Sequence, residues 1–418
     1  MQVKSLLNRV SRFKSFIFQR VNLVEEGDRE VIEVEVEPRA NSRPICSGCG
    51  QPAPCYDRRA QARRFEFVPL WAFAVVFVYR MRRVNCLFCG IVTERVPWSE
   101  GKETVTYAYR SFLATWAKRV SWQEVARYFH TSWRKVFFSV DYVVQYGLEH
   151  RDLSGIKAIG VDEVAWKFGH HYLTVVYQLD VGCRRLLWIG QERTEETLRS
   201  FFRQFGPERS ALLGFVCSDM WKPYLKVIKD CAAQATHILD RFHIVAQANK
   251  AVDEVRAQEA RRLSEEGRAP VLKKSRWLFL KRRQRLKGPQ KGRLRELLSM
   301  NLRTVRAYLL KEDLQQLWEY NAVSWARKFL RQWTRDALRS RLEPMQRIAR
   351  SLRKHEELIL NWFRAQKAFN SGIVEAYNGR LKLTLRRSGG WRTFRAAEVA
   401  LYHTLGHLPM PPVTHQFW

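Results

Sequence analysis

The sequence is short of acidic residues and cysteines, and it has no long hydrophobic run; each shortage excludes a class of protein. Its longest apolar stretch, residues 65–79, includes Glu66 and Pro69 and falls below the roughly 20 residues that cross a bilayer. Eight cysteines in 418 residues are too few for a disulfide scaffold. The basic N-terminus lacks the apolar segment and the cleavage site of a secretory signal. We therefore expect a cytoplasmic protein without a membrane segment.

The shortage of acids leaves a positive surplus, with 41 Asp and Glu against 73 Lys and Arg and a formal net charge of +32. A hydrophobic content of 46% and an aromatic content of 13% exclude a disordered basic tail, which lacks residues that build a core. Such a surplus repels itself unless a polyanion binds, so nucleic acid is the expected partner. The sequence contains no Walker loop and no Gly-x-Gly-x-x-Gly motif, which argues against a nucleotide cofactor.

The expected fold class is a multidomain α+β protein, because strand-like and helical patterns occupy different parts of the chain. We divide it into a zinc-ribbon domain (1–103), a helix-turn-helix domain (104–150), the first part of a mixed α/β core (151–250), a basic helical insertion (251–366), and the last core helices with the tail (367–418). Residues 256–306 carry 17 Lys and Arg against 4 Asp and Glu. A run this one-signed favours phosphate contact over a merely solvated face. The candidates are Lys281, Arg282, Arg283 and Arg285.

Four cysteines form two Cys-x-x-Cys-Gly sequences, at Cys46 and Cys49 and at Cys86 and Cys89. Each sequence forms a tight turn that aims two thiolates at one point, so the pair supplies the four sulfurs of a structural Zn²⁺ site. Residues 65–79 between them can form a β-hairpin, which together with the knuckles predicts a zinc ribbon. Free cysteines or a redox pair are the alternative. The nearby Arg63 and Arg64 suit phosphate contacts.

A helix-turn-helix is predicted between residues 107 and 148. Ser121 and Glu124 have the spacing of a capping box, and Ser132 can cap the following helix. That helix carries Trp133, Arg134 and Lys135 near its start, where a recognition helix contacts bases. The alternative is three ordinary core helices.

Residues 156–240 alternate apolar strands with amphipathic helices, and several strands end in an acidic residue. The predicted order is three antiparallel strands, a helix, a strand, a helix, a strand and a helix, which is the order of a ribonuclease-H-like fold. Asp162 ends the first predicted strand and Asp219 ends the fourth, so they can lie on neighbouring strands. Glu375, on a later helix, can supply a third carboxylate. Three converging carboxylates suit two divalent ions in phosphodiester chemistry, although a lone Asp at a strand end is usually a cap.

Other polar residues near these acids are secondary candidates. Asp240 is either a fourth carboxylate or a helix cap, and His243 is either a residue that orients a phosphate or a partly buried packing residue. On the helix of Glu375, the cation Lys382 shares a face with the carboxylate, and Arg386 and Arg387 follow as candidate DNA contacts.

Four runs carry a resemblance to a known family: Gly160-Val-Asp-Glu163, Ser218-Asp-Met-Trp-Lys-Pro-Tyr224, Asp240-Arg-Phe-His243 and Gly372-Ile-Val-Glu-Ala-Tyr-Asn378. They resemble the DDE transposases of the ISL-three insertion-sequence family, in the same order and over nearly the whole chain. The resemblance implies a zinc-binding N-terminus, a helix-turn-helix and a ribonuclease-H-like catalytic domain. It also implies Asp162, Asp219 and Glu375 as the metal-binding triad. Ala376 and Tyr377 depart from the family pattern beside the acid.

The resemblance implies a DNA transposase of a bacterial insertion sequence. Its substrates are double-stranded DNA, both the terminal inverted repeats of the element and the target, and its cofactors are two Mg²⁺ or Mn²⁺ ions with one structural Zn²⁺. We expect a homodimer or larger assembly on DNA, associated with the nucleoid. The alternatives are a non-catalytic DNA-binding regulator derived from a transposase and a structure-specific nuclease on the same fold.

Overall fold

A computed structural model describes residues 3–167, 169, 171–281, 283–367, 372–387 and 390–412. The chain forms two compact units, Met1–Asp152 with Leu383–Trp418, and Leu153–Lys382. The predicted DNA contact Arg282 lies outside the described residues, and Arg283 is described through its backbone alone.

A four-stranded sheet begins the first unit, in the order β1-β2-β6-β5. Its elements, preceded by helix α1 (Val3–Val10), are β1 (Phe16–Glu26), β2 (Arg29–Pro38), β5 (Arg63–Leu70) and β6 (Phe73–Tyr79). The hairpin predicted at 65–79 is confirmed as β5 and β6, which pair antiparallel. However, β6 also pairs with β2 in parallel, so the hairpin belongs to this sheet and not to the cysteine strands. The hydrophobic core of this sheet includes Phe77 and Trp98, which are almost fully buried.

The cysteine-bearing strands form a second, smaller sheet in the order β3-β8-β7-β4. Its strands are β3 (Ile45–Cys46), β4 (Cys55–Arg58), β7 (Arg82–Cys86) and β8 (Gly90–Arg95). The buried cluster here consists of Cys46, Ala53, Val84 and Cys86. So small a core stabilises little by itself, and sheets of this size depend on a cross-link or a metal.

The predicted helices of the first unit are confirmed as α2 (Tyr107–Ala117), α3 (Trp122–Tyr128) and α4 (Trp133–His150). Ser121 and Glu124 form the predicted capping box, and the Ser132 side chain caps α4. Helix α16 (Phe394–Leu405) belongs to the same unit. The Trp391 ring lies 4.6 Å from that of Trp122. The predicted segment 367–418 is therefore shared between the units, because these contacts hold its last helix beside α3 and α4.

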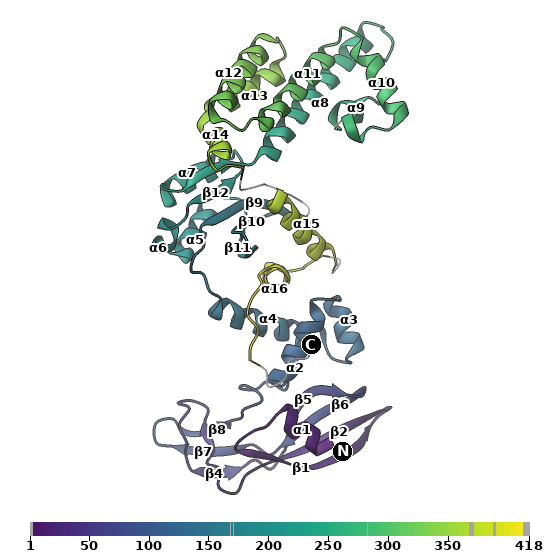
Figure 1. Ribbon diagram of the computed structural model, residues 1–418. Helices are drawn as coiled ribbons and strands as arrows, with labels where there is room; N and C mark the ends of the chain where they lie inside the picture. The colour runs from purple at the N-terminus through teal and green to yellow at the C-terminus, as the bar shows by residue number, and fades with distance from the viewer. Residues whose placement is uncertain are drawn as a thin grey trace. The chain divides into compact units, whose positions relative to one another are not determined.

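The second unit contains a five-stranded mixed sheet in the order β11-β10-β9-β12-β13 (Figure 1). Its strands are β9 (Ala158–Lys167), β10 (His171–Gln178), β11 (Arg185–Gln191), β12 (Phe215–Ser218) and β13 (Thr236–Leu239). The first three pair antiparallel, as predicted, and β12 runs parallel to both β9 and β13. Helices α5 (Glu195–Phe205), α6 (Pro207–Ala211) and α7 (Lys222–Cys231) connect them, and α5 and α7 share a buried core with the sheet.

The prediction that Asp162 ends its strand is wrong. β9 continues through Asp162 to Lys167, because β10 pairs with it along this whole length. On the other side, the pairing of β9 with β12 stops at Gly160 and Cys217. Asp162 therefore lies just beyond the end of β12, although its own strand continues.

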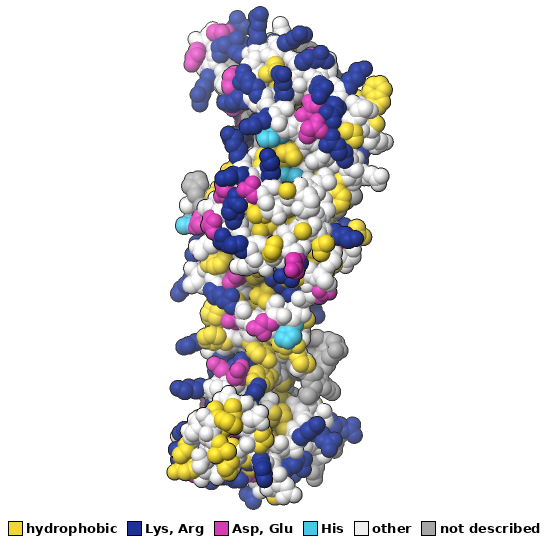
Figure 2. Space-filling model, turned by 90° about the vertical axis from the view of Figure 1, so that its left-hand side faces the viewer, with side chains coloured by type: hydrophobic (Ala, Val, Ile, Leu, Met, Phe, Trp, Pro, Cys, Tyr) yellow, Lys and Arg dark blue, Asp and Glu magenta, His cyan; other side chains and the backbone are white. Residues whose placement is uncertain are grey.

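The helical insertion follows β13 and shares one buried core with Ile238 and Leu239 of that strand. Its helices are α8 (Arg241–Glu265), α9 (Arg276–Leu280), η1 (Arg283–Arg285), α10 (Gly288–Leu298), α11 (Arg303–Gln316), η2 (Leu317–Glu319), α12 (Val323–Arg339), α13 (Glu343–Lys354) and α14 (Glu356–Arg364). The predicted start at 251 falls inside α8, which is continuous from Arg241. Figure 2 shows many Lys and Arg side chains and few acidic ones over these helices. Among the described residues, no helix is long and apolar enough to cross a membrane.

A buried carboxylate joins two helices of the insertion. Glu259 of α8 accepts hydrogen bonds from the backbone N–H groups of Arg303 and Thr304, at 2.8 and 2.7 Å, and from the Thr304 hydroxyl at 2.6 Å. Its side chain is 1% exposed. The carboxylate thus satisfies N–H groups that the first turn of α11 leaves without intrahelical partners.

We expect Glu259→Gln to lower the free energy of unfolding by about 1–3 kcal/mol, because an amide offers one acceptor and turns a donor toward buried N–H groups. Urea unfolding followed by circular dichroism measures the change. The control is Glu265→Gln, an exposed position on the same helix, which should leave the midpoint unchanged. Equal midpoints for the two variants would contradict the capping role of Glu259.

Candidate active site and metal centre

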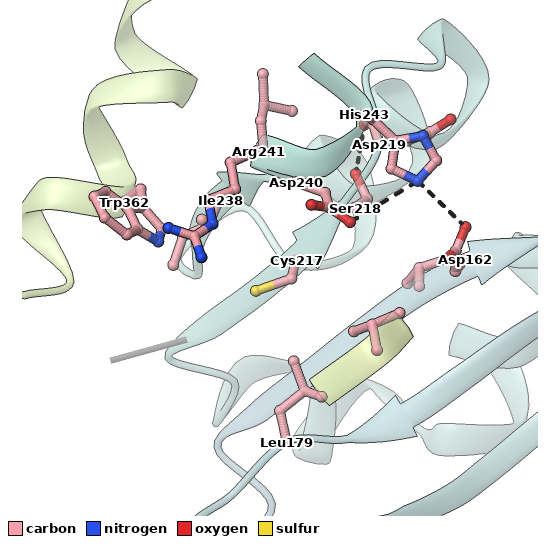
Figure 3. Close-up of a pocket in the computed structure, with 13 residues that line it drawn as sticks. Asp162, Leu179, Cys217, Ser218, Asp219, Ile238, Asp240, Arg241, His243 and Trp362 are labelled. Atoms are coloured by element: carbon pink, nitrogen blue, oxygen red, sulfur yellow. Dashed lines mark hydrogen bonds and ion pairs between the residues drawn. The ribbon is translucent and has the colours of Figure 1, made fainter. Parts of the chain in front are cut away.

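Three aspartates meet where neighbouring strands of the second sheet end. Asp219 directly follows β12, Asp240 directly follows β13, and Asp162 lies on β9 just past its last pair with β12. All three line one cavity of about 20 Å³, together with His243 (Figure 3). The parallel strands β9, β12 and β13 point their carboxyl ends to the same edge, and this topology brings the acids together.

Backbone N–H groups orient each of the three carboxylates. Asp162 accepts from Glu163 N–H at 2.7 Å, and Asp219 accepts from Trp221 N–H at 3.0 Å. Asp240 accepts from Phe242 N–H at 2.7 Å and is the N-cap of α8. The capping alternative for Asp240 is therefore confirmed, yet the same side chain also lines the cavity. In each case, one carboxylate oxygen accepts a hydrogen bond from the backbone one or two residues further along the chain.

Helix α15 (Gly372–Arg387) supplies a second support for Asp162. The Asn378 amide donates to Asp162 Oδ2 at 2.5 Å and accepts from the Tyr177 hydroxyl at 2.8 Å. Tyr177 lies on β10 and is fully buried. Burial raises the pKa of Asp162, while the N–H of Glu163 opposes the rise. The chain Tyr177–Asn378–Asp162 thus fixes the direction of a carboxylate that water scarcely reaches.

An arginine lies between two further acids at this edge. The Arg193 guanidinium is 2.7 Å from Glu163 Oε1 and 3.6 Å from Asp219 Oδ2, and it stacks over Trp221 at 4.2 Å from the ring centroid. Burial raises the pKa of Glu163 to about 7; the charge of Asp219 adds to the rise and Arg193 opposes it. Sequence reasoning missed Arg193 and Tyr177, because no motif marks a residue that reaches the site from another strand or loop, and it assigned no role to Trp221 within the run 218–224.

His243 lies between two of the aspartates. Its Nε2 is 3.8 Å from Asp162 Oδ1 and 3.8 Å from Asp240 Oδ2, and the side chain is 37% exposed. Figure 3 shows the ring directed at both carboxylates. The side chain is partly buried, so this exposure is compatible with both the packing and the phosphate-orienting interpretations of His243.

Glu375 lies on the helix that supports Asp162, but at its exposed side. Its neighbour Val374 lines the cavity, and Asn378 three residues later holds Asp162. Among the described residues, the acids around the cavity do not form a group of three with ligand oxygens all within 4.8 Å. The structure thus brings Asp162 and Asp219 to one cavity and places Glu375 on the adjoining helix.

The four predicted zinc ligands form a cluster. The sulfurs of Cys46, Cys49, Cys86 and Cys89 all lie within 4.8 Å of one another. A tetrahedral Zn²⁺ with bonds of about 2.3 Å sets its sulfurs about 3.8 Å apart, so this spacing suits the ion. The backbone N–H of Cys49 lowers the pKa of Cys46 to about 7, while the Cys46 side chain raises that of Cys89 to about 12. Four thiolates this close repel one another unless a cation binds. Cys55, the other cysteine of this sheet, lies outside the cluster.

Several predicted DNA contacts are engaged within the protein. Arg63 donates to the carbonyls of Gly101 and Glu103, both at 2.8 Å. Arg64 pairs with Glu26 and Glu33, and Lys135 pairs with Glu66. Arg387 donates to the carbonyl of Lys118 at 3.2 Å. Other predicted contacts with exposed side chains are Trp133, Arg134, Lys281, Arg285, Lys382 and Arg386.

Comparison with known proteins gives a consistent result. The model of the ISL-three (ISL3) family of DDE transposases, described as "Transposase", matches residues 159–401. The transposase for insertion sequence element IS1001 of Bordetella parapertussis is 30% identical over 393 residues, which cover 93% of this chain and 95% of that protein. The transposase for element IS1557 of Mycobacterium tuberculosis is 28% identical over 415 residues, which cover 94% and 92%.

We expect Cys89→Ser to abolish stoichiometric zinc binding, because three thiolates leave one tetrahedral position unfilled. Zinc content after gel filtration, measured by atomic emission, tests this. The matched control is Cys55→Ser, since Cys55 is also exposed but lies outside the cluster. Full zinc content in the Cys89 variant would show that the cluster is not the metal site.

We expect Asn378→Ala to weaken Mn²⁺ binding at the acidic site by about 10- to 100-fold, the usual effect of removing a group that orients a ligand. Electron paramagnetic resonance titration of free Mn²⁺ measures the affinity. Tyr177→Phe removes only the hydroxyl that holds Asn378, so it should have a smaller effect and add nothing in the Asn378→Ala background. If the two substitutions weakened Mn²⁺ binding additively, Tyr177 would not act on the site through Asn378.

Proposed function

The chain belongs to the ISL-three family of DDE transposases, and from this premise we propose that it cuts and joins DNA at divalent ions held by Asp162, Asp219 and Glu375. The observation that carries the proposal is the meeting of Asp162 and Asp219 at one cavity, where Asp219 directly follows β12 and Asp162 lies on the adjacent strand β9. The sheet order β11-β10-β9-β12-β13, with three antiparallel strands and two parallel ones, supports a ribonuclease-H-like catalytic domain.

The residues at the cavity suit two Mg²⁺ or Mn²⁺ ions. Carboxylate oxygens are the ligands that these ions prefer; β9 supplies Asp162, and the ends of β12 and β13 supply Asp219 and Asp240. Glu375 is the proposed third member of the triad, from the helix that already contacts Asp162 through Asn378. Asp240 and His243 are secondary ligands or phosphate contacts beside it.

The proposed reaction has two phosphodiester transfers. In the first, water attacks the phosphorus at the end of the element, the bond to the 3′ oxygen breaks, and a free 3′-OH is left. In the second, that 3′-OH attacks a phosphodiester of the target, so the new bond replaces the one that breaks. Bound Mg²⁺ or Mn²⁺ supplies charge that activates the attacking oxygen and stabilises the leaving oxygen.

The chain's own residues prepare this site. Asn378 and Tyr177 hold Asp162 in one orientation before substrate arrives, so no reorganisation is needed during the reaction. Arg193 offsets part of the negative charge of Glu163 and Asp219 and, with Trp221 against one face, presents a guanidinium that can bind a phosphate oxygen.

We further propose that the rest of the chain binds double-stranded DNA. The cysteine cluster would hold one structural Zn²⁺, and α3 and α4 would form a helix-turn-helix that presents Trp133 and Arg134 to the terminal inverted repeats. The exposed cations Lys281, Arg285, Lys382 and Arg386 would contact phosphates of element or target. Because two element ends must be joined, we expect a homodimer or larger assembly on DNA.

We expect Asp162→Asn, Asp219→Asn and Glu375→Gln each to lower strand joining by on the order of 10³-fold, since ions at such sites contribute several kcal/mol to the barrier. The assay follows nicking and joining of a labelled duplex taken from the DNA that flanks the gene. Glu208→Gln, an exposed acid on α6, is the control and should keep full activity. Each variant should bind the duplex as the unmodified protein does.

Three outcomes distinguish the hypotheses. Joining at the unmodified rate by the Asp162 or Glu375 variant means that the triad is wrongly assigned. Binding without any metal-dependent nicking by the unmodified protein favours a regulator. Nicking without joined product, and without preference for the flanking sequence, favours a structure-specific nuclease.

A further inference from the structure

A groove in the first unit is surrounded by cations that the proposed function has not used. It has a volume of about 360 Å³ and lies where the loop before β1, the segment before β3 and the end of β8 meet. Arg12, Lys14, Arg43 and Arg95 line it, and all four side chains are exposed. In the part of the chain that the structure describes, none of the four forms an ion pair. Their charge is therefore available to a ligand.

The acid within the groove does not cancel this charge. Glu94 is buried and already pairs with Arg82, whose Nη2 and Nε lie 2.7 and 2.9 Å from the carboxylate. The same carboxylate accepts from the Tyr79 hydroxyl at 2.5 Å and from Arg82 N–H at 2.7 Å. The pair is neutral as a whole, so the four exposed cations set the sign of the groove.

The apolar lining gives the groove a fixed shape. Phe16 and Val96 are buried in the lining, and Arg82 lies over the Phe16 ring at 5.7 Å. Phe16 and Tyr79 also pack edge to face in the same core. Because these lining residues are apolar, they offer no acidic group to pair with the cations around the groove.

The cysteine cluster positions one side of the groove. Cys46 and Ile45 form strand β3, which pairs with Glu94 and Arg95 of β8. Arg43 precedes that strand by two residues, and β8 itself begins directly after Cys89. A metal ion that joins the two knuckles would therefore hold Arg43 and Arg95 in register.

This arrangement contrasts with the arginines first predicted to contact DNA. Arg63 and Arg64 are bound to carbonyls and carboxylates of the same unit, whereas the groove residues have no such partners among the ion pairs of the described chain. Binding a phosphate through Arg64 would require two ion pairs to break. The groove requires no such loss.

We propose that this groove binds the phosphate backbone of double-stranded DNA, with Arg12, Lys14, Arg43 and Arg95 as the contacts and the cysteine-bound metal as the element that aligns them. The inference rests on the proposed function, which supplies DNA as the ligand. The contacts carry no base-specific information, so the groove would position the duplex and leave sequence reading to other residues.

The test is the salt dependence of binding, measured by fluorescence anisotropy with a labelled duplex from the flanking DNA and with an unrelated duplex. Asp162→Asn protein is used, without Mg²⁺, so that cleavage does not interfere. Each phosphate contact contributes a slope of about 0.9 in log K against log salt. Arg43→Ala/Arg95→Ala should therefore lower the slope by about 1.8 on both duplexes and weaken binding by on the order of 10-fold or more.

The matched control is Arg20→Ala/Arg29→Ala, which removes the same charge from exposed positions on β1 and β2. It should leave the slope within error of the parent protein. Removal of zinc by a chelator should lower the slope of the parent protein but add little to the Arg43/Arg95 variant, because both changes act on the same contacts. Circular dichroism checks that each variant is folded.

The outcomes separate this inference from the proposed function. If the parent protein binds neither duplex at low salt, DNA binding itself fails. If it binds with a steep slope that the Arg43/Arg95 variant retains, the groove is wrongly assigned while the function stands. An equal decrease of the salt slope in the variant and in the control would show an effect of net charge alone. That result would also overturn the assignment of the groove.

Discussion

The hydrogen-bonded chain from Tyr177 through Asn378 to Asp162 is the contact on which the second unit's chemistry depends. It joins positions 216 residues apart and fastens helix α15 to the central strands of the sheet. Val374 packs on the same sheet and would clash with any Cβ at Gly160, 2.9 Å away. The close approach of helix and strand thus requires glycine at that position. Without this contact, the sheet topology would still bring the aspartates together and Glu163 N–H would still bind one oxygen of Asp162, but the other oxygen and the helix of Glu375 would lose this support.

The helical insertion is part of the structural support of the site. Its helices share one apolar core with β13, and Asn361 of α14 donates to the backbone of His237 in that strand at 2.8 Å. Trp318 and Trp362 are buried in this core, with their rings 5.3 Å apart. Asp240 directly follows β13. The helices that pack on β13 therefore also support the position of Asp240 beside the other acids. The apolar side of the insertion therefore forms this core, whereas its basic side chains are exposed at the surface.

Local patterns predicted much of this structure and long-range contacts explain the rest. Alternating residues predicted the strands, and the Ser121–Glu124 spacing predicted a real capping box, because both signals depend on near neighbours. The sequence also identified the cysteine quartet, since paired knuckles leave few alternatives. It misplaced the end of β9, because the strand continues past Asp162 only through its pairing with β10, a contact that the local pattern does not show. It could not identify Arg193, nor the pairing of Arg64 with Glu26 and Glu33, because these depend on which strands become neighbours.

The separation between β9 and α15 has a consequence for synthesis of the chain. Ribosomes add about 5–20 residues per second, so the 216 residues between Asp162 and Asn378 take about 10–40 seconds to appear. The last strand of the sheet, β13, is synthesised within that interval and ends at Leu239, and from then on the complete sheet still lacks the helix that carries Asn378. A nascent or truncated chain could therefore display the aspartates without an organised site. The acidic site is therefore completed late, after nearly the whole chain has been synthesised.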